Sequence, residues 1–391
     1  MDIIVKKIVL LFDILFHLLP VDKRKVLFMS FKGQYNDNPK YISEKLHEIH
    51  PEIRIYWVIA NKSYTKRIPN YVNVVQPNTL KYLYIKNRCK IVVENSAGMY
   101  LVNSSKQMMR FIKLLKNRKQ IDVATWHGNP IKHIGAQIPG NEKWCEDTFF
   151  STADMLIAGC EQIQQVFNQA FLHKIPIEMI GTPRTDILFN NAVEKNEIRR
   201  HLNLPADKKI ILYAPTYRNT PFDSGIAQMQ CIRFNELFKA LNKKFGGDWV
   251  FVFRLHNVVQ NSIDINSISI DSNGCFINGN QFDDMNEYLI ASDVLLTDYS
   301  GCIYDVALTD IPCFLFAHDR EHYVEKERGM YMNLDSFPYP FADTFDQLII
   351  NINNYNEEES KVRIHDFLKK IGNIEDGNAA LRMVCYLERY M

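Results

Sequence analysis

A chain of 391 residues, with 47% hydrophobic and 23% charged residues, is long enough for two domains. This composition excludes disorder, collagen and coiled coil as descriptions of the whole chain. The 46 basic and 45 acidic residues leave a net charge of +1, which gives no bulk attraction to nucleic acid, so we expect no nucleic-acid partner. The eight cysteines form no C-x-x-C pair and are typical of reduced thiols in a cytoplasm.

The amino-terminal segment Met1–Leu19 is apolar, but it is interrupted by charges and is followed by no small-residue cleavage site. At 100° per residue its polar side chains share one narrow stripe, formed by Asp2, Lys6, Asp13 and His17. The segment is therefore predicted to be a helix with a broad apolar face. Two interpretations stay open: a helix lying in a membrane interface, or a helix packed on the body of the protein.

Short apolar runs then alternate with helical stretches such as Pro39–His50 and Glu161–His173. The first set of predicted strands is Lys25–Phe31, Arg54–Ala60, Lys90–Glu94, Asp122–Trp126, Met155–Ala158 and Glu178–Ile180. The second set is Lys209–Tyr213, Trp249–Arg254, Cys275–Ile277, Val294–Thr297 and Cys313–Phe316. Apolar strands between helices indicate parallel sheets covered on both faces. We expect an α/β protein with two doubly wound halves, joined near residues 185–207, and a ligand in the cleft between them.

Polar residues follow the predicted strands, where open parallel sheets bind ligands. His127 and Gly128 end the strand Asp122–Trp126, and Pro130 suits the first position of a following helix. A histidine at a strand tip titrates near neutral pH and can exchange a proton with a substrate. The alternative is a turn histidine that is bonded only to backbone.

The second half repeats this pattern after three strands, with Arg218, Arg254 and Ser300 as the polar residues. Ser300 is predicted to cap a helix over Gly301–Leu308, which would expose backbone amides to a phosphate. The two arginines could donate paired hydrogen bonds to the same anion. An ordinary helix cap is the alternative for Ser300.

Several known motifs are missing. There is no G-x-G-x-x-G after a strand, no G-x-x-x-x-G-K-[ST] and no G-x-S-x-G, so dinucleotide oxidoreductases, P-loop NTPases and esterases lose support. No two aspartates stand two residues apart, which excludes a D-x-D metal site. We therefore expect chemistry without a dedicated metal or cofactor.

The ordered set of short motifs resembles the CDP-glycerol glycerophosphotransferases that build teichoic acids and related capsular polymers. The motifs are Ser30-Phe31-Lys32-Gly33, Asn36-Asp37-Asn38-Pro39, Asn95-Ser96-Ala97, Trp126-His127-Gly128-Asn129-Pro130, Gly181-Thr182-Pro183-Arg184, Tyr213-Ala214-Pro215-Thr216-Tyr217-Arg218, Arg254-Leu255-His256, Asp298-Tyr299-Ser300, Arg328-Gly329-Met330-Tyr331 and Glu375-Asp376-Gly377-Asn378.

The resemblance implies a GT-B fold, with two Rossmann-like domains and an interdomain cleft. The expected segments are an acceptor- and membrane-facing domain over 1–187, a CDP-donor domain over 188–365, and a helix over 366–391 that returns to the first domain. The family transfers glycerol phosphate from CDP-glycerol to a hydroxyl of a lipid-linked or polymer acceptor and releases CMP.

Residue by residue, the resemblance assigns His127 as the general base and His256 as a contact to the pyrophosphate, although these roles could be exchanged. The residues expected to bind substrate are Trp126, Gly128, Asn129, Pro130, Arg184, Pro215, Thr216, Arg218, Arg254, Ser300, Gly301 and, more weakly, Arg328. Asp298 and Asp305 belong to the same set but could instead orient the loop.

Three positions depart from the family pattern: Asn129 replaces a Thr, Asn257 a Pro, and Gly301 a Ser. They leave the donor alcohol open, so a CDP-ribitol phosphotransferase is an alternative. An inverting GT-B glycosyltransferase and a non-catalytic relative that binds polymer or lipid are the others.

Basic residues near the amino-terminal segment, and the stretch Lys106–Lys119 with its helical spacing, could contact anionic lipid headgroups. A solvated basic helix is the alternative for that stretch. We expect a peripheral protein on the cytoplasmic face of the cell membrane, with an anionic membrane surface as a partner.

Overall fold

The computed structural model describes residues 2–60, 68–96, 100–103, 109–112, 117, 119–141, 153–171, 175–190, 194–216, 229–255, 276–282, 284–320 and 329–391. The chain forms two compact units. Unit 1 consists of Met1–Gly128, Ile134–Asp186 and Ile374–Met391, and unit 2 consists of Asn129–His133 and Ile187–Asn373.

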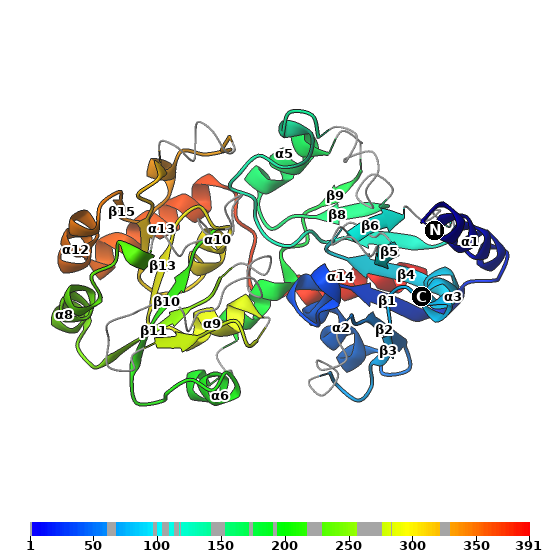
Figure 1. The fold of residues 1–391 in the computed structure, drawn as a ribbon, viewed down its shortest axis with the longest axis horizontal. Coiled ribbons are helices and arrows are strands. Elements are labelled where there is room, and N and C mark those ends of the chain that lie inside the picture. Colours follow the sequence, from blue (N-terminus) through cyan, green and yellow to red (C-terminus); the bar gives the residue numbers. More distant parts are fainter. Residues whose placement is uncertain are drawn as a thin grey trace. The chain divides into compact units, whose positions relative to one another are not determined.

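Unit 1 contains a seven-stranded parallel sheet with the order β3-β2-β1-β4-β7-β8-β9 (Figure 1). Its strands are β1 (Asp22–Met29), β2 (Arg54–Val58), β3 (Asn73–Val75), β4 (Cys89–Glu94), β7 (Ile121–Ala124), β8 (Met155–Ile157) and β9 (Ile177–Glu178). The apolar runs predicted all of them except β3. An antiparallel pair, β5 (Tyr100–Asn103) and β6 (Met109–Ile112), forms a separate small sheet.

The helical spacing assigned to Lys106–Lys119 is wrong for Met109–Ile112, which pairs with β5 as a strand. Antiparallel pairing supplies the backbone hydrogen bonds there, and a helix cannot form at the same time. Much of the rest of that stretch lies outside the described residues.

Helices cover both faces of the unit 1 sheet. On one face α2 (Asp37–Ile49) and α14 (Ala379–Leu387) bury Ile42, Leu46 and Met383 against Val26 and Trp57. On the other face α3 (Leu80–Arg88) and α1 (Asp2–His17) pack over Leu27 and Val92, with Leu83 and Val9 in the contact. Unit 1 also contains α5 (Glu161–Ala170) and the short helices η1 (Phe31–Gly33), η3 (Gly135–Gln137) and η9 (Glu388–Tyr390), whereas η5 (Pro183–Phe189) begins in unit 1 and ends in unit 2.

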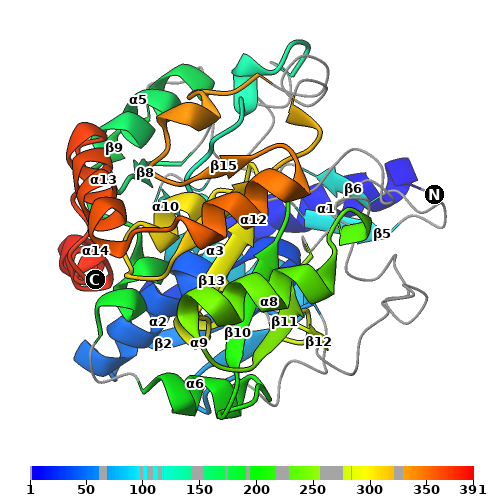
Figure 2. The ribbon, with the colours of Figure 1, turned by 90° about the vertical axis from the view of Figure 1, so that its left-hand side faces the viewer.

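Unit 2 contains a six-stranded parallel sheet with the order β12-β11-β10-β13-β14-β15. The strands are β10 (Lys209–Ala214), β11 (Trp249–Phe253), β12 (Phe276–Asn278), β13 (Val294–Thr297), β14 (Cys313–Phe316) and β15 (Phe341–Ala342). The helices are α6 (Lys195–His201), α8 (Phe234–Phe245), α9 (Met285–Ala291), α10 (Cys302–Val306), α12 (Phe345–Asn353), α13 (Glu357–Lys370) and η8 (Leu334–Ser336). Figure 2 shows α8 and α12 side by side over one face of this sheet, where Leu237 and Leu348 join the core.

Two parallel sheets, each with helices on both faces, confirm the predicted α/β class with Rossmann-like domains. The return of the chain to unit 1 begins at Ile374 rather than at residue 366. The reason is that Phe367 of α13 packs in unit 2 against the rings of Tyr304 and Phe337. The expected cleft stays a prediction.

Candidate active site

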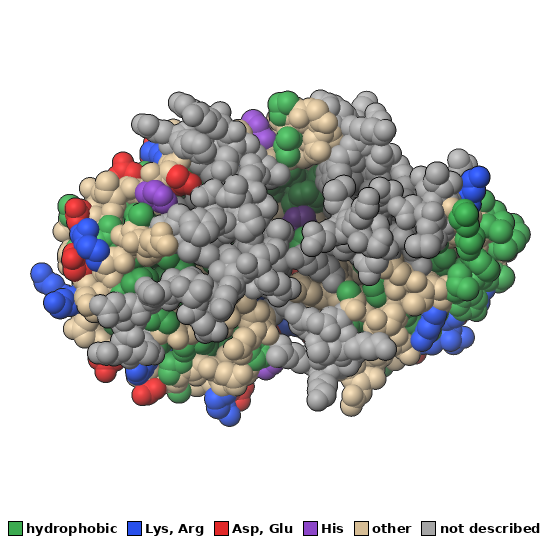
Figure 3. All heavy atoms as spheres, viewed as in Figure 1, with side chains coloured by type: hydrophobic (Ala, Val, Ile, Leu, Met, Phe, Trp, Pro, Cys, Tyr) green, Lys and Arg blue, Asp and Glu red, His purple; other side chains and the backbone are tan. Residues whose placement is uncertain are grey.

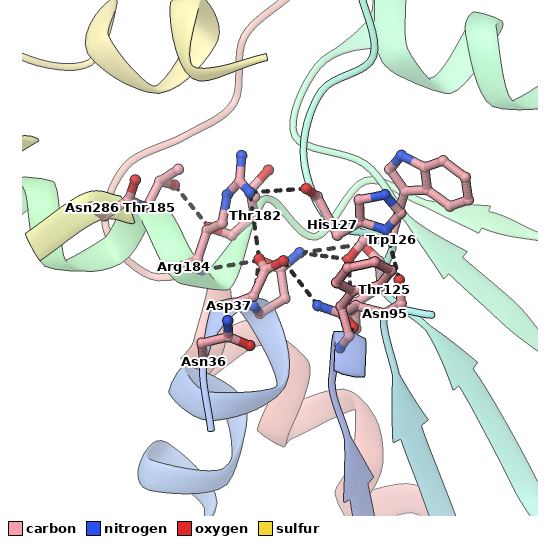
Figure 4. Close-up of polar contacts among 12 residues, drawn as sticks. Asn36, Asp37, Asn95, Thr125, Trp126, His127, Thr182, Arg184, Thr185 and Asn286 are labelled. Carbon is pink, nitrogen blue, oxygen red and sulfur yellow. Dashed lines mark hydrogen bonds and ion pairs between the residues drawn. The ribbon is translucent and has the colours of Figure 1, made fainter. Parts of the chain in front are cut away.

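The carboxyl ends of β1, β4 and β7 in unit 1 carry a connected group of polar side chains beside His127 (Figure 4). The side chains come from the start of α2, from the residue after β4, and from η5. The central members are Asp37, Asn95 and Arg184. Parallel strands bring these distant segments to one sheet edge, as expected for an open α/β sheet.

His127 has a defined tautomer. Its Nδ1 lies 2.8 Å from the backbone oxygen of Asn95, and a carbonyl oxygen can only accept a hydrogen bond. Nδ1 therefore carries the proton and donates it, so the neutral ring presents Nε2 as a lone pair. Within the described residues no hydrogen bond engages Nε2. The ring stacks on Trp126, with centroids 4.5 Å apart, and more distantly on Phe31.

The surroundings of His127 favour the neutral ring. His127 is an exposed residue, but the protein atoms around it still limit hydration of an imidazolium. This desolvation is the main reason that the pKa of His127 is lowered, and the positive charge of Arg184 acts in the same direction. The Asn95 carbonyl and the Asp37 carboxylate oppose the shift.

Arg184 packs against the turn that carries His127. Its Nη1 donates to the His127 carbonyl at 3.2 Å and lies 3.5 Å from Oδ1 of Asp37. Gly128 has φ of +133°, and a Cβ at this position would lie 3.1 Å from Nη2 of Arg184. Glycine therefore provides both the backbone conformation and the room for the guanidinium.

The turn before His127 is held in an unusual conformation. Trp126 is buried with φ of +55°, which is uncommon for a bulky residue. The side-chain amide of Asn38 donates to the carbonyls of Thr125 and Trp126, and its oxygen accepts from the backbone N–H of Arg184 at 3.1 Å. Backbone strain at such positions persists only where surrounding contacts fix it.

In unit 2, the ends of β10 and β13 are joined by the buried carboxylate of Asp298. Its Oδ1 accepts from the backbone N–H groups of Thr216 at 2.8 Å and Tyr299 at 2.6 Å. The carboxylate of Asp298 therefore orients the loop that begins at Pro215 and the loop that carries Ser300. Asp305 is buried in α10, with 1% of its surface exposed.

The predicted helix after His127 is wrong. The chain from Asn129 to His133 runs instead beside Gly329–Tyr331 in unit 2, through a bridge between Lys132 and Met330. The N–H of His133 donates to the Gly329 carbonyl at 2.8 Å, and the N–H of Tyr331 donates to Ile131 at 2.9 Å. Pro130 fits this extended path as well as it fits a helix start, because both need φ near −65°.

The helix expected at Gly301–Leu308 is shorter and spans Cys302–Val306. Ser300 Oγ accepts from the N–H of Cys302 at 3.4 Å, which is a weak capping interaction. A Cβ on Gly301 would lie 2.6 Å from the backbone oxygen of Asn129. Two of the three departures from the family pattern, at positions 129 and 301, are therefore in contact within unit 2.

The side chain of Arg254 holds the backbone of the turn that follows β12. It is 7% exposed, and its Nη1 donates to the carbonyls of Gly279 and Phe282, the former at 2.8 Å. Its guanidinium also lies over the ring of Tyr288. These contacts fix the turn after β12, which sequence reasoning did not anticipate.

Three of the predicted site residues, His256, Arg218 and Arg328, lie outside the described residues. Three others were missed as site residues: Asp37, Asn38 and Asn95. The signal for them was present, because each lies in one of the short motifs that carry the family resemblance.

The fold agrees with that of known proteins. The structure superposes on that of the wall teichoic acid polymerase TagF, soaked with CDPG, with a TM-score of 0.77, 28% sequence identity and coverage of 94% of this chain and 89% of that one. TagF is a GT-B enzyme, so the GT-B assignment is confirmed.

Residues 11–389 match the family described as CDP-glycerol:poly(glycerophosphate) glycerophosphotransferase, and the chain belongs to this family. It is 29% identical to the teichoic acid poly(glycerol phosphate) polymerase of Staphylococcus epidermidis over 92% of this chain and 50% of that protein. It is 28% identical to the teichoic acid glycerol-phosphate transferase of Staphylococcus aureus over 93% and 92%, respectively. The chain thus spans about half the length of the polymerase and most of the length of the transferase.

Proposed function

We propose that this protein transfers glycerol phosphate from CDP-glycerol to a hydroxyl of a lipid-linked or polymer acceptor in teichoic acid synthesis. In this reaction the acceptor oxygen forms a bond to the phosphorus that carries glycerol. The bond from that phosphorus to the bridging oxygen breaks, and CMP leaves. Family membership and the glycerol-phosphate relatives support this activity.

The observation that carries the proposal is the hydrogen bond from Nδ1 of His127 to the Asn95 carbonyl. It leaves Nε2 as the basic atom, and desolvation, which lowers the pKa of His127, favours the neutral ring. His127 Nε2 accepts the proton of the attacking hydroxyl as the new bond forms. Such a base contributes about 10²–10⁴-fold to the rate, while positioning and charge stabilisation supply most of the remainder.

In this proposal unit 2 binds the donor substrate, CDP-glycerol. Thr216, Ser300 and Gly301 lie at strand ends that the Asp298 carboxylate holds together. The carboxyl ends of parallel strands are where doubly wound sheets bind nucleotides. The expectation that no resident metal is needed stays a prediction, which treatment of the enzyme with a chelator would test.

The test is product analysis with the purified chain, CDP-glycerol and a lipid-linked glycerol-phosphate acceptor. CMP release and a new phosphodiester are expected, and His127→Ala should slow both by about 10²-fold or more. His365→Ala, an exposed histidine of α13, is the matched control and should keep the wild-type rate. A new glycosidic bond, or full activity in His127→Ala, would contradict the proposal.

We also propose that α1 rests on an anionic membrane surface. Among the described side chains of the polar stripe, Asp13 faces the protein, whereas an ordinary surface helix turns its polar side to solvent. Asp13 is fully buried and accepts a hydrogen bond from Nδ2 of Asn87, at 2.9 Å from Oδ1. The outer side is apolar, with exposed fractions of 64% for Ile4, 48% for Ile8, 55% for Leu11, 49% for Ile14, 46% for Leu15 and 77% for Leu18.

Figure 3 shows this face as a continuous hydrophobic surface with basic side chains beside it. Lys7, Lys23 and Arg24 are exposed nearby, whereas Lys25 is buried and paired with Asp22. An apolar face flanked by cations fits the interface of an anionic bilayer. Within the described residues, no helix is long and apolar enough to cross a membrane.

Vesicle co-sedimentation tests this placement. Vesicles with phosphatidylglycerol should bind the protein, and a variant with Ile8→Asn, Leu11→Asn and Leu15→Asn should lose about tenfold or more of that binding. The matched control, Ile350→Asn with Val362→Asn, changes equally exposed apolar residues of unit 2 and should bind as wild type. Equal binding by both variants would refute the placement.

A further inference from the structure

We propose that Asp37, held in place by Asn95, is a positioning residue that stabilises the protonated state of His127 during proton transfer. The kinetic effect expected from this inference rests on the proposed function, whereas the expected tautomer and pKa of His127 do not. Nothing in the reaction alone requires a carboxylate from α2 at this place.

Asn95 is the connecting residue. It is fully buried and uses every polar atom of its side chain: Oδ1 accepts from the N–H of Phe31 at 2.9 Å, and Nδ2 donates to Ser30 at 3.1 Å and to Asp37 at 2.9 Å. Its backbone oxygen accepts the His127 proton. One residue therefore fixes both the ring and the carboxylate, so their relative positions cannot relax independently.

Asp37 is held in an unfavourable backbone conformation, with φ of +58°. Aspartate tolerates this region better than most residues, but it is uncommon for any residue other than glycine. Its carboxylate accepts from the N–H of Asn38 at 2.8 Å, from Asn95, and from Nη1 of Arg184 at 3.5 Å. These contacts hold a negative charge next to Asn95 and Arg184, the two residues that also contact His127, at the cost of backbone strain, which is typical of functional sites.

Two charges in the described part of unit 1 act on His127, and they have opposite signs: Asp37 from the start of α2, and Arg184 from η5. When Nε2 accepts a proton the ring becomes positive, and Arg184 alone would oppose that change. Asp37 pairs with Arg184 and attracts the imidazolium. The carboxylate therefore stabilises the charge that develops as the base accepts its proton, and Asn95 keeps that proton on Nε2 by occupying Nδ1.

The decisive experiment measures the ring directly by NMR of the full-length protein labelled with ¹⁵N histidine. The chain has 11 histidines, so the His127→Asn spectrum is needed to assign the resonance. The wild type should show the tautomer protonated at Nδ1. In Asp37→Asn the pKa of His127 should fall by about 0.5–1 pH unit. In Arg184→Gln it should rise, and because the two expected changes have opposite signs, general loosening of the fold does not explain both.

Asp22→Asn is the matched control, because Asp22 is also paired with an arginine but lies at the start of β1, at the other end of the strand from the site. It should leave the His127 titration unchanged. In the transfer reaction, Asp37→Asn should move the acidic limb of kcat/KM to lower pH by the same amount as the NMR titration.

The NMR result separates this inference from the proposed function. An unchanged His127 pKa in Asp37→Asn, or a ring protonated at Nε2 in the wild type, would overturn the inference even if transfer is observed. A shifted titration in a protein that transfers no glycerol phosphate would support the inference while the proposed function fails.

Discussion

Glu375 provides a sharp test of how burial governs the stability of unit 1. It lies where the chain returns to unit 1, and its Oε2 accepts from the N–H of Thr182 at 3.0 Å and from Oγ1 of Thr185 at 3.2 Å. Its Oε1 is buried without a hydrogen-bond partner among the described residues. Burial is the main cause that raises the pKa of Glu375 to about 7; the charge of Asp186 adds to the effect, and the threonine contacts oppose it.

The sign of the pH dependence follows from proton binding. The folded chain holds the Glu375 proton up to about pH 7, whereas the unfolded chain releases it near 4.5. The resulting stabilisation is complete below pH 4.5 and is lost as the pH rises through 7. Raising the pKa from 4.5 to about 7 corresponds to about 3 kcal/mol, at about 1.4 kcal/mol for each tenfold change in proton affinity.

Urea unfolding from pH 5 to pH 8.5 measures this contribution. The free energy of unfolding of the wild type should fall relative to Glu375→Gln by most of those 3 kcal/mol, because glutamine has no proton to lose. Asp376→Asn is the matched control: the pKa of this neighbouring, exposed carboxyl is lowered by its contacts with Arg382 and Asn378, so its effect is confined to pH below 4. Parallel pH curves for the wild type and Glu375→Gln would refute the reasoning.

Three further substitutions test single contacts. Gly128→Ala should lower transfer activity about tenfold or more, measured as CMP release, because φ of +133° is strained for alanine and its Cβ would lie 3.1 Å from the guanidinium of Arg184. Thermal unfolding close to wild type would confirm a local effect. Gly301→Ala should destabilise unit 2 by about 1–3 kcal/mol, because its Cβ would lie 2.6 Å from the Asn129 carbonyl oxygen. An unchanged midpoint of urea unfolding would contradict that packing. Glu94→Met should stabilise the protein by about 1–3 kcal/mol in urea unfolding, because Glu94 is fully buried and neither of its carboxyl oxygens has a hydrogen bond among the described residues. Burial also raises the pKa of this carboxyl. A loss of stability would show that the carboxyl has a partner.

The sequence alone was sufficient to predict the two parallel sheets. The centres of the predicted strands, such as Ile91–Val93 and Val294–Leu296, are apolar without alternation, and this pattern is typical of strands covered on both faces. The two- and three-residue strands β15 and β3 were missed, because so few residues give a weak pattern, although the equally short β9 and β12 were predicted. The sequence also placed His127 at a strand end, because a glycine and a proline directly after an apolar run mark where the strand stops.

Only the tertiary structure decided which atom of His127 is basic. The Asn95 carbonyl that receives the Nδ1 proton is 32 residues away in the chain, and the Asp37 carboxylate is 58 residues from Asn95. No local pattern encodes these distances, because β1, β4 and β7 become neighbours only when the sheet forms.

The amino-terminal helix α1 also shows which features the sequence determines and which depend on the tertiary structure. Its periodicity determined that Asp13 and His17 share one side and that the other side is apolar, but both orientations satisfy this pattern. Asn87, which lies on α3 and is itself buried, turns the polar side inward by binding Asp13. Sequence fixes which residues share a face, whereas the partner that a face meets depends on contacts between segments far apart in the chain, and only folding creates those contacts.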